Sequence, residues 1–198
     1  MIKKSIDIIG AMQSAVPYLS EEQIEIFLEI CEFKVLKNKE VIFKAGTSSR
    51  LAGFILEGVV RGYYVDTNGL EINSILRVEK TFIGVPEWLY ESLPTKYTFE
   101  SILESKVLIF ELPHLETLAL SHSSFLKFCL SAYKENFTTL LGRVESAIGK
   151  NPVERYKELL NKNPLFISKA FNKHIANYLG ITPVSLSRIV KRLKENKK

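Results

Sequence analysis

Between Lys34 and Leu112 the sequence alternates short β-rich runs with turn signals. The clearest turn is Asp66-Thr67-Asn68-Gly69, because Gly adopts a positive φ angle at little cost and Asp and Asn favour tight turns. Many short strands at regular spacing are typical of an antiparallel sandwich, barrel or jelly roll. The pattern therefore predicts a β-roll or jelly roll. Its predicted strands cover residues 41–43, 53–56, 59–65, 72–76, 98–103 and 107–112.

Helical patterns flank these strands on both sides. Ser20 and Gln23 have the spacing of a capping box, which predicts a short helix over about residues 21–31. From Pro113 the chain becomes helical and contains no further β-rich run. The predicted fold class is therefore α+β, with an N-terminal antiparallel β-roll, flanking helices, one long helix and a C-terminal helical domain.

The long helix, over about residues 124–148, carries an apolar side chain every three or four residues. This spacing is close to the a/d pattern of a coiled coil. One interpretation is a core stripe packed on the β-roll, and the other is a two-fold dimer seam. A helix of about 20 residues spans ~30 Å, more than a small barrel needs to cover, so the length favours the seam. The predicted seam residues are Leu126, Leu130, Tyr133, Phe137, Leu140 and Val144.

Charge is distributed unevenly about Gly149-Lys150-Asn151-Pro152, which we interpret as a domain boundary. Residues 149–198 hold 12 Lys and Arg against 3 Glu, a net charge of +9. Residues 1–148 hold 15 Lys and Arg against 19 Asp and Glu, a net charge of −4. This imbalance favours a polyanionic partner for the C-terminal domain, although a solvated basic helix would give the same charge.

The C-terminal domain contains a helix-turn-helix pattern centred on Gly180. Gly180 suits the left-handed turn that ends a first helix, Thr182 suits an N-cap, and Pro183 suits the first turn of a second helix. The second helix has an apolar stripe on one face and polar side chains on the other. The apolar stripe consists of Leu186, Ile189, Val190 and Leu193.

This layout is expected of a recognition helix that enters the major groove of double-stranded DNA. Arg188 would donate two hydrogen bonds to a guanine, the commonest base-specific contact. The predicted base-reading residues are Val184, Ser185, Ser187 and Arg188. The predicted phosphate contacts, which position the helix without reading sequence, are Lys169, Lys173, Thr182, Lys191 and Arg192.

Together these features resemble the Crp–Fnr family of bacterial transcription regulators, and the resemblance covers nearly the whole chain. The matching segments are residues 45–46, 54–61, 66–69, 82–84 and 180–189. The resemblance implies that residues 1–148 form a cyclic-nucleotide-binding-like sensor with a dimerisation helix. It implies that residues 149–198 form a helix-turn-helix domain, and that the homodimer binds a pseudo-palindromic DNA site. It also implies RNA polymerase as a partner.

The region that would hold a ligand departs from the cAMP-binding members of this family. Those members carry a Gly-Glu pair and then Arg-Ser in their phosphate cassette, whereas this chain has Gly84-Val85 and Thr95-Lys96. Lys96 lacks the planar fork with which Arg binds a phosphate, so we expect weak or no cAMP binding. Two interpretations of this region remain open. It forms a pocket for another small-molecule effector, or its aromatic side chains fill the space as a core. The candidate pocket residues are Phe82, Gly84, Val85, Trp88, Lys96, Tyr97 and Tyr133.

Other classes of protein find less support in the sequence. Cys31 and Cys129 are too few for a four-thiolate metal site and are expected to be buried thiols in a reducing cytosol. The sequence contains no nucleophile elbow, phosphate loop or metal-binding His motif. We therefore expect that the protein is not an enzyme, binds no metal and has no cofactor that the sequence identifies with certainty.

No apolar run reaches membrane-spanning length, and Asp7 interrupts the N-terminal apolar residues, which favours a cytoplasmic protein. The alternative function is a ligand-binding or scaffolding module whose C-terminal helices dock a protein.

Overall fold

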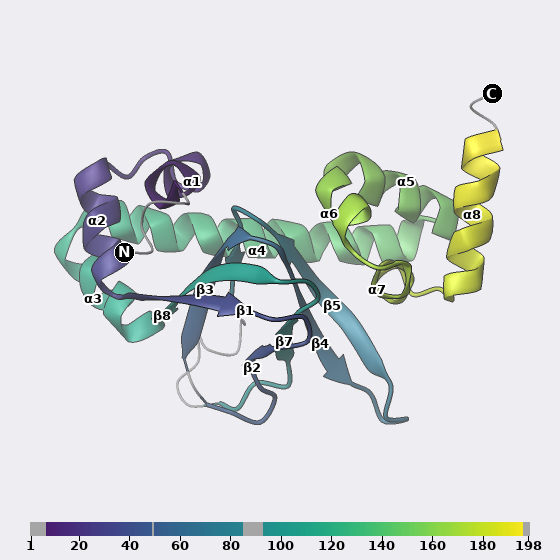
Figure 1. The fold of residues 1–198 in the computed structure, drawn as a ribbon, viewed down its shortest axis with the longest axis horizontal. Coiled ribbons are helices and arrows are strands. Elements are labelled where there is room, and N and C mark those ends of the chain that lie inside the picture. Colours follow the sequence, from purple (N-terminus) through teal and green to yellow (C-terminus); the bar gives the residue numbers. More distant parts are fainter. Residues whose placement is uncertain (1–6, 49, 85–92, 196–198) are drawn as a thin grey trace.

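The structure is a computed structural model that describes residues 7–48, 50–84 and 93–195. A β-roll lies between the N-terminal helices at one end and a C-terminal helical domain at the other (Figure 1). The strands are β1 (Cys31–Leu36), β2 (Val41–Phe43), β3 (Leu51–Glu57), β4 (Val59–Val65), β5 (Glu71–Val78), β6 (Phe82–Ile83), β7 (Thr98–Ser101) and β8 (Ser105–Glu111). The helices are α1 (Ile8–Ala15), α2 (Glu21–Glu29), α3 (Leu112–Ser121), α4 (Ser123–Gly149), α5 (Pro152–Lys162), α6 (Pro164–Lys169), α7 (Asn172–Tyr178) and α8 (Pro183–Glu195). The predicted α+β class is confirmed.

The strands form two antiparallel sheets with the orders β1-β8-β3-β6 and β2-β7-β4-β5. Each sheet combines strands from the beginning and the end of the β region, as a jelly roll does. β4 and β5 form the predicted hairpin, in which Asp66 Oδ1 accepts the backbone N–H groups of Leu70 at 2.8 Å and Asn68 at 2.9 Å. These bonds, that of Leu70 foremost, lower the pKa of the Asp66 carboxyl. Gly69 completes the turn with a φ of 79°.

The N-terminal helices follow the capping chemistry of the sequence, with one difference at the end of α2. Ser20 and Gln23 form the predicted capping box. The helix ends at Glu29, not at Cys31, because Cys31 begins β1 and pairs with Phe110 of β8. Pairing with a strand far along the chain therefore overrides the local helical spacing at this point.

Aromatic side chains form the core under these helices. Phe27 contacts Phe110 and Phe128 edge-on, with ring centroids 5.0 and 5.5 Å apart. Phe82 packs in the same cluster, 4.7 Å from Phe54 and 4.8 Å from Phe128. Since Phe128 belongs to α4, this core attaches the first half of the long helix to the β-roll.

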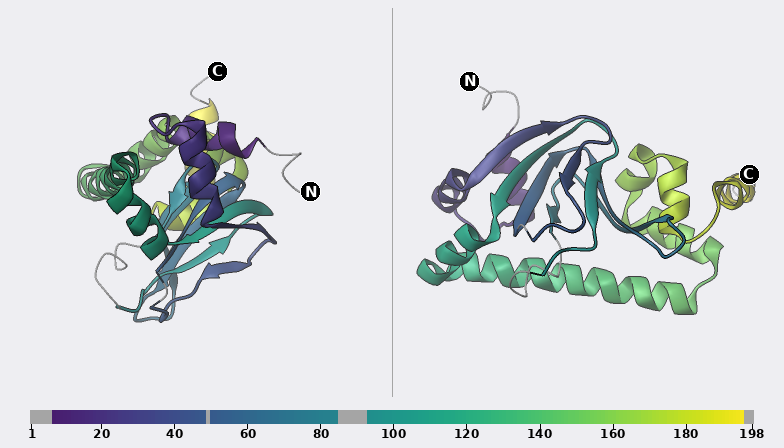
Figure 2. Two further views of the ribbon diagram at one scale, coloured as in Figure 1. Left: turned by 90° about the vertical axis from the view of Figure 1, so that its left-hand side faces the viewer. Right: turned by 90° about the horizontal axis from the view of Figure 1, so that it is seen from below.

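The second half of α4 passes beneath the C-terminal helical domain, as the right-hand view of Figure 2 shows. α4 ends at Gly149 and α5 begins at Pro152, so the predicted domain boundary lies between these two helices. Asn151 caps α5 in a capping box with Glu154. α5 ends at Lys162 with Asn163 as its C-cap, and Pro164 at once begins α6, which the sequence analysis did not predict.

The two domains share one apolar cluster. Val59 and Ile102 of the β-roll pack with Leu159, Ile175 and Leu186 of the helical domain. The domains are therefore packed against each other rather than joined only through α4. Among the helices of the described residues, none combines the length and apolar character needed to cross a bilayer.

Candidate nucleic-acid interface

The α8 helix lies at the end of the molecule farthest from the N-terminal helices (Figure 1). Its inner face is buried through Leu186 and Ile189, while Val184, Ser187 and Arg188 on the outer face are exposed. Val184 is 60% exposed on this outer face. This face of α8 is therefore free to meet a partner.

The turn before α8 has the predicted geometry. Gly180 has a φ of 67°, in the left-handed region that Gly adopts without strain. Thr182 Oγ1 accepts the backbone N–H of Ser185 at 3.1 Å, so its N-cap role is confirmed. The hydroxyl of Ser185 lies 3.0 Å from the same oxygen, and Ser185 is half-buried. Of the four predicted base-reading residues, Ser185 is therefore the least accessible.

The five predicted phosphate contacts have different surroundings. Arg192 and Lys191 are exposed on α8, and Lys191 lies 4.0 Å from Glu195. Lys173 is exposed on α7. Lys169 forms an ion pair with Glu79, the residue that follows β5, so in this arrangement its charge is already engaged by the β-roll.

The α7 helix is docked on the free edge of β5. The side-chain amide of Asn177 accepts the backbone N–H of Asn73 at 2.6 Å and donates to the carbonyl of Glu71 at 2.7 Å. The Asn73 side chain donates in turn to the backbone carbonyl of His174 at 3.2 Å. Because β5 is an edge strand, its outward backbone groups need such partners. The sequence analysis missed this contact, although a polar Asn within the predicted strand 72–76 was the available signal.

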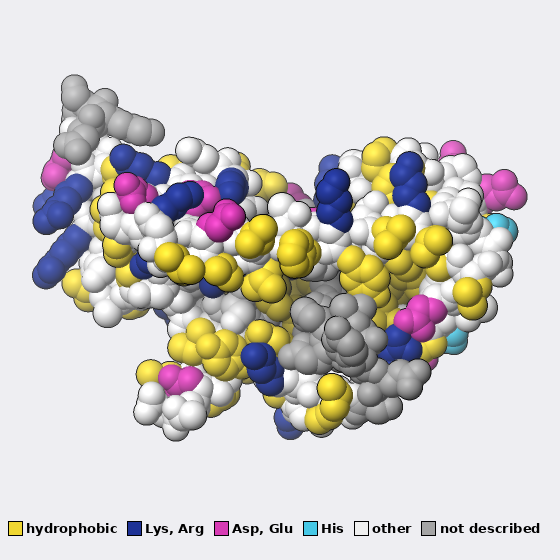
Figure 3. All heavy atoms as spheres, turned by 180° about the vertical axis from the view of Figure 1, so that it is seen from behind, with side chains coloured by type: hydrophobic (Ala, Val, Ile, Leu, Met, Phe, Trp, Pro, Cys, Tyr) yellow, Lys and Arg dark blue, Asp and Glu magenta, His cyan; other side chains and the backbone are white. Residues whose placement is uncertain are grey.

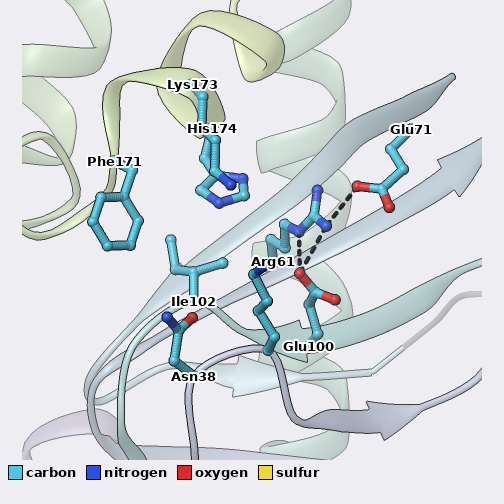
Figure 4. A pocket seen from close by; sticks show the side chains of 9 residues that line it. Asn38, Arg61, Glu71, Glu100, Ile102, Phe171, Lys173 and His174 are labelled. Carbon is cyan, nitrogen blue, oxygen red and sulfur yellow. Dashed lines mark hydrogen bonds and ion pairs between the residues drawn. The ribbon is translucent and has the colours of Figure 1, made fainter.

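A charged cluster lies beside this contact, on the same sheet (Figure 4). Arg61 donates from Nε to Glu100 at 2.8 Å, from Nη1 to Asn73 at 3.0 Å and from Nη2 to Glu71 at 2.6 Å. Arg61 and Glu100 are buried, so each charge depends on the other for its stabilisation. This cluster also escaped the sequence analysis, which read these strands only for their apolar residues.

His174 is buried at the start of α7 and faces this cluster. Burial lowers its pKa to about 4, and the positive charges of Arg61, Lys173 and Lys39 add to the effect. The imidazole is therefore neutral near pH 7.

Two cavities border the helical domain. The first, which we call the interdomain cavity, has a volume of about 390 Å³ and lies between the β-roll and the start of α7. The second is a groove of about 540 Å³ between α4, α5 and the end of α7. In this groove the Arg143 guanidinium stacks 3.7 Å from the ring of Tyr178, which ties α4 to α7.

Of the predicted effector-pocket residues that the structure describes, none lines either of these two cavities. Phe82 belongs to the aromatic core, and Tyr97 packs edge-on against Tyr64 with Lys96 nearby. Tyr133 is exposed on α4, and Gly84 follows β6. Val85 and Trp88 lie outside the described residues. For Phe82, the aromatic-core interpretation is the one that the structure supports, because its ring fills space between Phe54 and Phe128.

The predicted seam residues form an exposed apolar stripe along α4. All six are exposed, Phe137 to 68%, and the yellow side chains along the helix are visible in Figure 3. The opposite face buries Phe125 and Phe128 in the β-roll core. The interpretation of the stripe as packing on the β-roll is therefore wrong, because α4 presents different residues to that core.

The thiols and the metal-ligand side chains show no reactive arrangement. Burial raises the pKa of Cys31 to about 12, and it raises the pKa of Cys129 as well, so both thiols stay protonated. Within residues 7–48, 50–84 and 93–195, no group of three or more His, Cys, Asp or Glu side chains is placed to hold a metal ion.

The fold is that of Crp/Fnr regulators. FixK2 from Bradyrhizobium japonicum is similar with a TM-score of 0.73 at 17% identity, over 85% of this chain and 86% of FixK2. CLP, a c-di-GMP-responsive global regulator from Xanthomonas campestris, is similar with a TM-score of 0.68 at 15% identity, over 90% of this chain and 93% of CLP. A regulator from Eubacterium rectale assigned to the Crp/Fnr family gives a TM-score of 0.67 at 15% identity, over 90% of this chain and 85% of its own.

No protein-family model matches the sequence, and no curated protein matches it significantly. The resemblance expected from the sequence is thus confirmed for the fold. Structural similarity at such low sequence identity establishes the fold but does not establish the function.

Proposed function

We propose that the protein is a homodimeric, sequence-specific DNA-binding transcription regulator of the Crp/Fnr type, and not an enzyme. The observation that carries the proposal is α8, a basic helix with a buried apolar face and an exposed outer face, on the fold of known regulators. Val184 and Arg188 are both exposed on the outer face of this helix, where they can contact a partner.

Base reading is assigned to the exposed outer face of α8. Arg188 has no partner among the described residues, so its guanidinium is available for a bidentate contact with guanine O6 and N7. Val184 cannot accept a hydrogen bond but fits against the methyl group of thymine. Ser187 is exposed between them, and Ser185 contributes less because it is half-buried against Thr182.

Phosphate contacts are assigned to the cations that surround this face, Lys173, Lys191 and Arg192, together with the exposed Thr182. Lys169 joins them only if its ion pair with Glu79 opens. The contact of α6 with the residue that follows β5 therefore withholds one cation from DNA.

Dimerisation is assigned to the exposed stripe of α4. Leu130, Phe137 and Val144 lie on one face of the helix and would bury their side chains against a second copy. A two-fold pair along α4 would place the two α8 helices to read half-sites about 34 Å apart, one turn of DNA.

cAMP is not assigned as an effector. Thr95 and Lys96 stand where a phosphate-binding Arg-Ser pair would be needed, and Phe82 fills the aromatic core. The region between these residues includes 85–92, which the structure does not describe.

The proposal is tested by selecting fragments of genomic DNA with the purified protein at about 150 mM salt, where purely electrostatic binding is suppressed. We expect the recovered fragments to share a two-fold motif with half-sites about 10 base pairs apart. Two outcomes would contradict base reading and favour a module that docks a protein. One is the recovery of random fragments. The other is the recovery of no fragment, with Arg188→Ala behaving like the wild type.

A further inference from the structure

The interdomain cavity lies where two parts of the chain about 100 residues apart meet. Its β-roll wall carries Lys39, Arg61, Glu71 and Glu100, and its helical wall carries Lys173 and His174 (Figure 4). Its volume of about 390 Å³ falls within the range of small-molecule sites. A ligand here would touch both domains at once.

The charges of the cavity do not cancel. Glu71 and Glu100 both bind the Arg61 guanidinium, at 2.6 and 2.7 Å, and so turn toward it. Lys39 and Lys173 have no hydrogen-bond or ion-pair partner for their side chains within the described part of the chain. Three cations thus face two carboxylates, and the surplus positive charge lies on the two lysines.

The surplus positive charge affects the pKa of the buried His174. Burial lowers its pKa most, the charges of Arg61, Lys173 and Lys39 lower it further, and Glu71 raises it. The imidazole is therefore neutral and adds polar atoms without adding charge. A negatively charged group would relieve the repulsion that these cations exert on one another.

Lys39 is held in place by its backbone. It has a φ of 66°, which is uncommon for a residue with a side chain, and its N–H donates to the carbonyl of Ser101 at 2.7 Å. Such conformations cost free energy and persist only where the surrounding structure holds them. The strand-to-strand turn thus directs a lysine to the cavity at a cost.

The cavity also has apolar walls. Phe171 from the helical domain is 51% exposed, and Ile102 from the β-roll is buried. An exposed Phe next to free lysines suits a ligand with a carbon body as well as charged groups.

We propose that the interdomain cavity binds a small organic anion with at least two negative charges, of the phosphate-ester or dicarboxylate class, held by Lys39 and Lys173. Its regulatory effect rests on the proposed function, because Lys173 is also assigned to a DNA phosphate. An anion held by Lys173 competes with that phosphate, so ligand and DNA weaken each other's binding by the same factor.

Binding is tested first without DNA, using glycerol 2-phosphate and succinate as probes of the two classes. The thermal unfolding midpoint is measured with about 10 mM probe and with KCl of equal ionic strength, because a ligand of the native state raises the midpoint. We expect at least one probe to raise the midpoint of the wild type beyond the effect of KCl. Failure of both probes to do so would overturn the proposal.

Three variants make this test specific. Lys39→Gln removes one charge and keeps the β-carbon that shapes the backbone, and we expect at least a fivefold loss of probe affinity in titration calorimetry. Lys39→Arg, which keeps the charge, and Lys37→Gln, an exposed lysine of the same turn outside the cavity, should both stay within twofold of the wild type. Equal affinity in Lys39→Gln and the wild type would contradict the assignment.

The second arm uses a selected DNA fragment. The probe should weaken DNA binding of the wild type more than KCl does, and this excess should vanish in Lys39→Gln. If Lys39→Gln instead loses DNA affinity in the absence of probe and no probe shifts the midpoint, Lys39 contacts the DNA backbone and the small-anion proposal is wrong. If no DNA fragment is selected at all, the calorimetry still decides whether the anion binds.

Discussion

The side-chain amide of Asn177 replaces a neighbouring strand for Asn73. It accepts the backbone N–H of Asn73 at 2.6 Å and, through its NH₂ group, donates to the carbonyl of Glu71 at 2.7 Å. Asn73 lies in the edge strand β5 of the β-roll, and Asn177 lies in α7 of the C-terminal helical domain. One amide therefore couples the position of the helical domain to the edge of a sheet.

Replacing Asn177 with Ala should destabilise this contact by about 1–3 kcal/mol, because it leaves polar groups of β5 without their partner. We expect a lower urea midpoint and faster hydrogen exchange at the backbone amide of Asn73. Asn172→Ala, at the exposed start of the same helix, is the matched control and should change neither quantity. Unchanged exchange at Asn73 in Asn177→Ala would show that the docking does not depend on this amide.

Replacing Arg188 with Ala should cost about 1–3 kcal/mol on the selected DNA site and much less on random DNA, because base contacts carry the specificity. The measurement is a pair of titrations at fixed salt, one with each DNA. Lys157→Ala removes one positive charge from α5 in the same domain and serves as the control for net charge. Equal losses on both DNAs for Arg188→Ala would contradict its base-reading role.

Replacing Phe137 with Asp should produce monomers with much weaker DNA binding, because it places a charge at the most exposed of the six predicted seam residues. Sedimentation measures the association state, and the DNA titration follows. Thr138→Asp places the same charge about 100° further around α4 and should leave a dimer. A stable dimer of Phe137→Asp with wild-type DNA affinity would refute the seam.

His174 should make the protein less stable at acid pH. Its native pKa is about 4, below the ordinary value of 6.5, so the unfolded chain binds more protons between these values. The contribution is fully present above pH 6.5 and is lost as the pH falls toward 4, by up to about 1.4 kcal/mol per pH unit. Urea midpoints of wild type and His174→Gln should therefore converge as the pH falls through this window. A difference that stays constant from pH 7 to pH 4 would show that His174 does not titrate with folding.

The features that the sequence predicted well are local ones. The capping box of Ser20, the hairpin turn ending in Gly69 and the left-handed turn at Gly180 each depend on residues within about four positions. The stripe of α4 is also local, because helical periodicity places Leu130, Phe137 and Val144 on one face whatever surrounds the helix.

Other features needed the tertiary structure. The end of α2 at Glu29 is set by the pairing of Cys31 with Phe110, and the position of Phe82 is set by Phe54 and Phe128. A sequence pattern marks an apolar or aromatic residue but does not say which distant surface will cover it. An aromatic core and an effector pocket therefore look alike until the partners of Phe82 are known.

The sequence by itself determined the class of fold, the recognition-helix pattern and the apolar face of α4, since these follow from periodicity, turn chemistry and charge. Only the tertiary structure decided that Lys169 pairs with Glu79, that Asn177 binds the edge of β5 and that Lys39 and Lys173 share one cavity. The physical reason is distance along the chain. These contacts join residues 90 or more positions apart, and their formation depends on how the whole β-roll and the helical domain pack together.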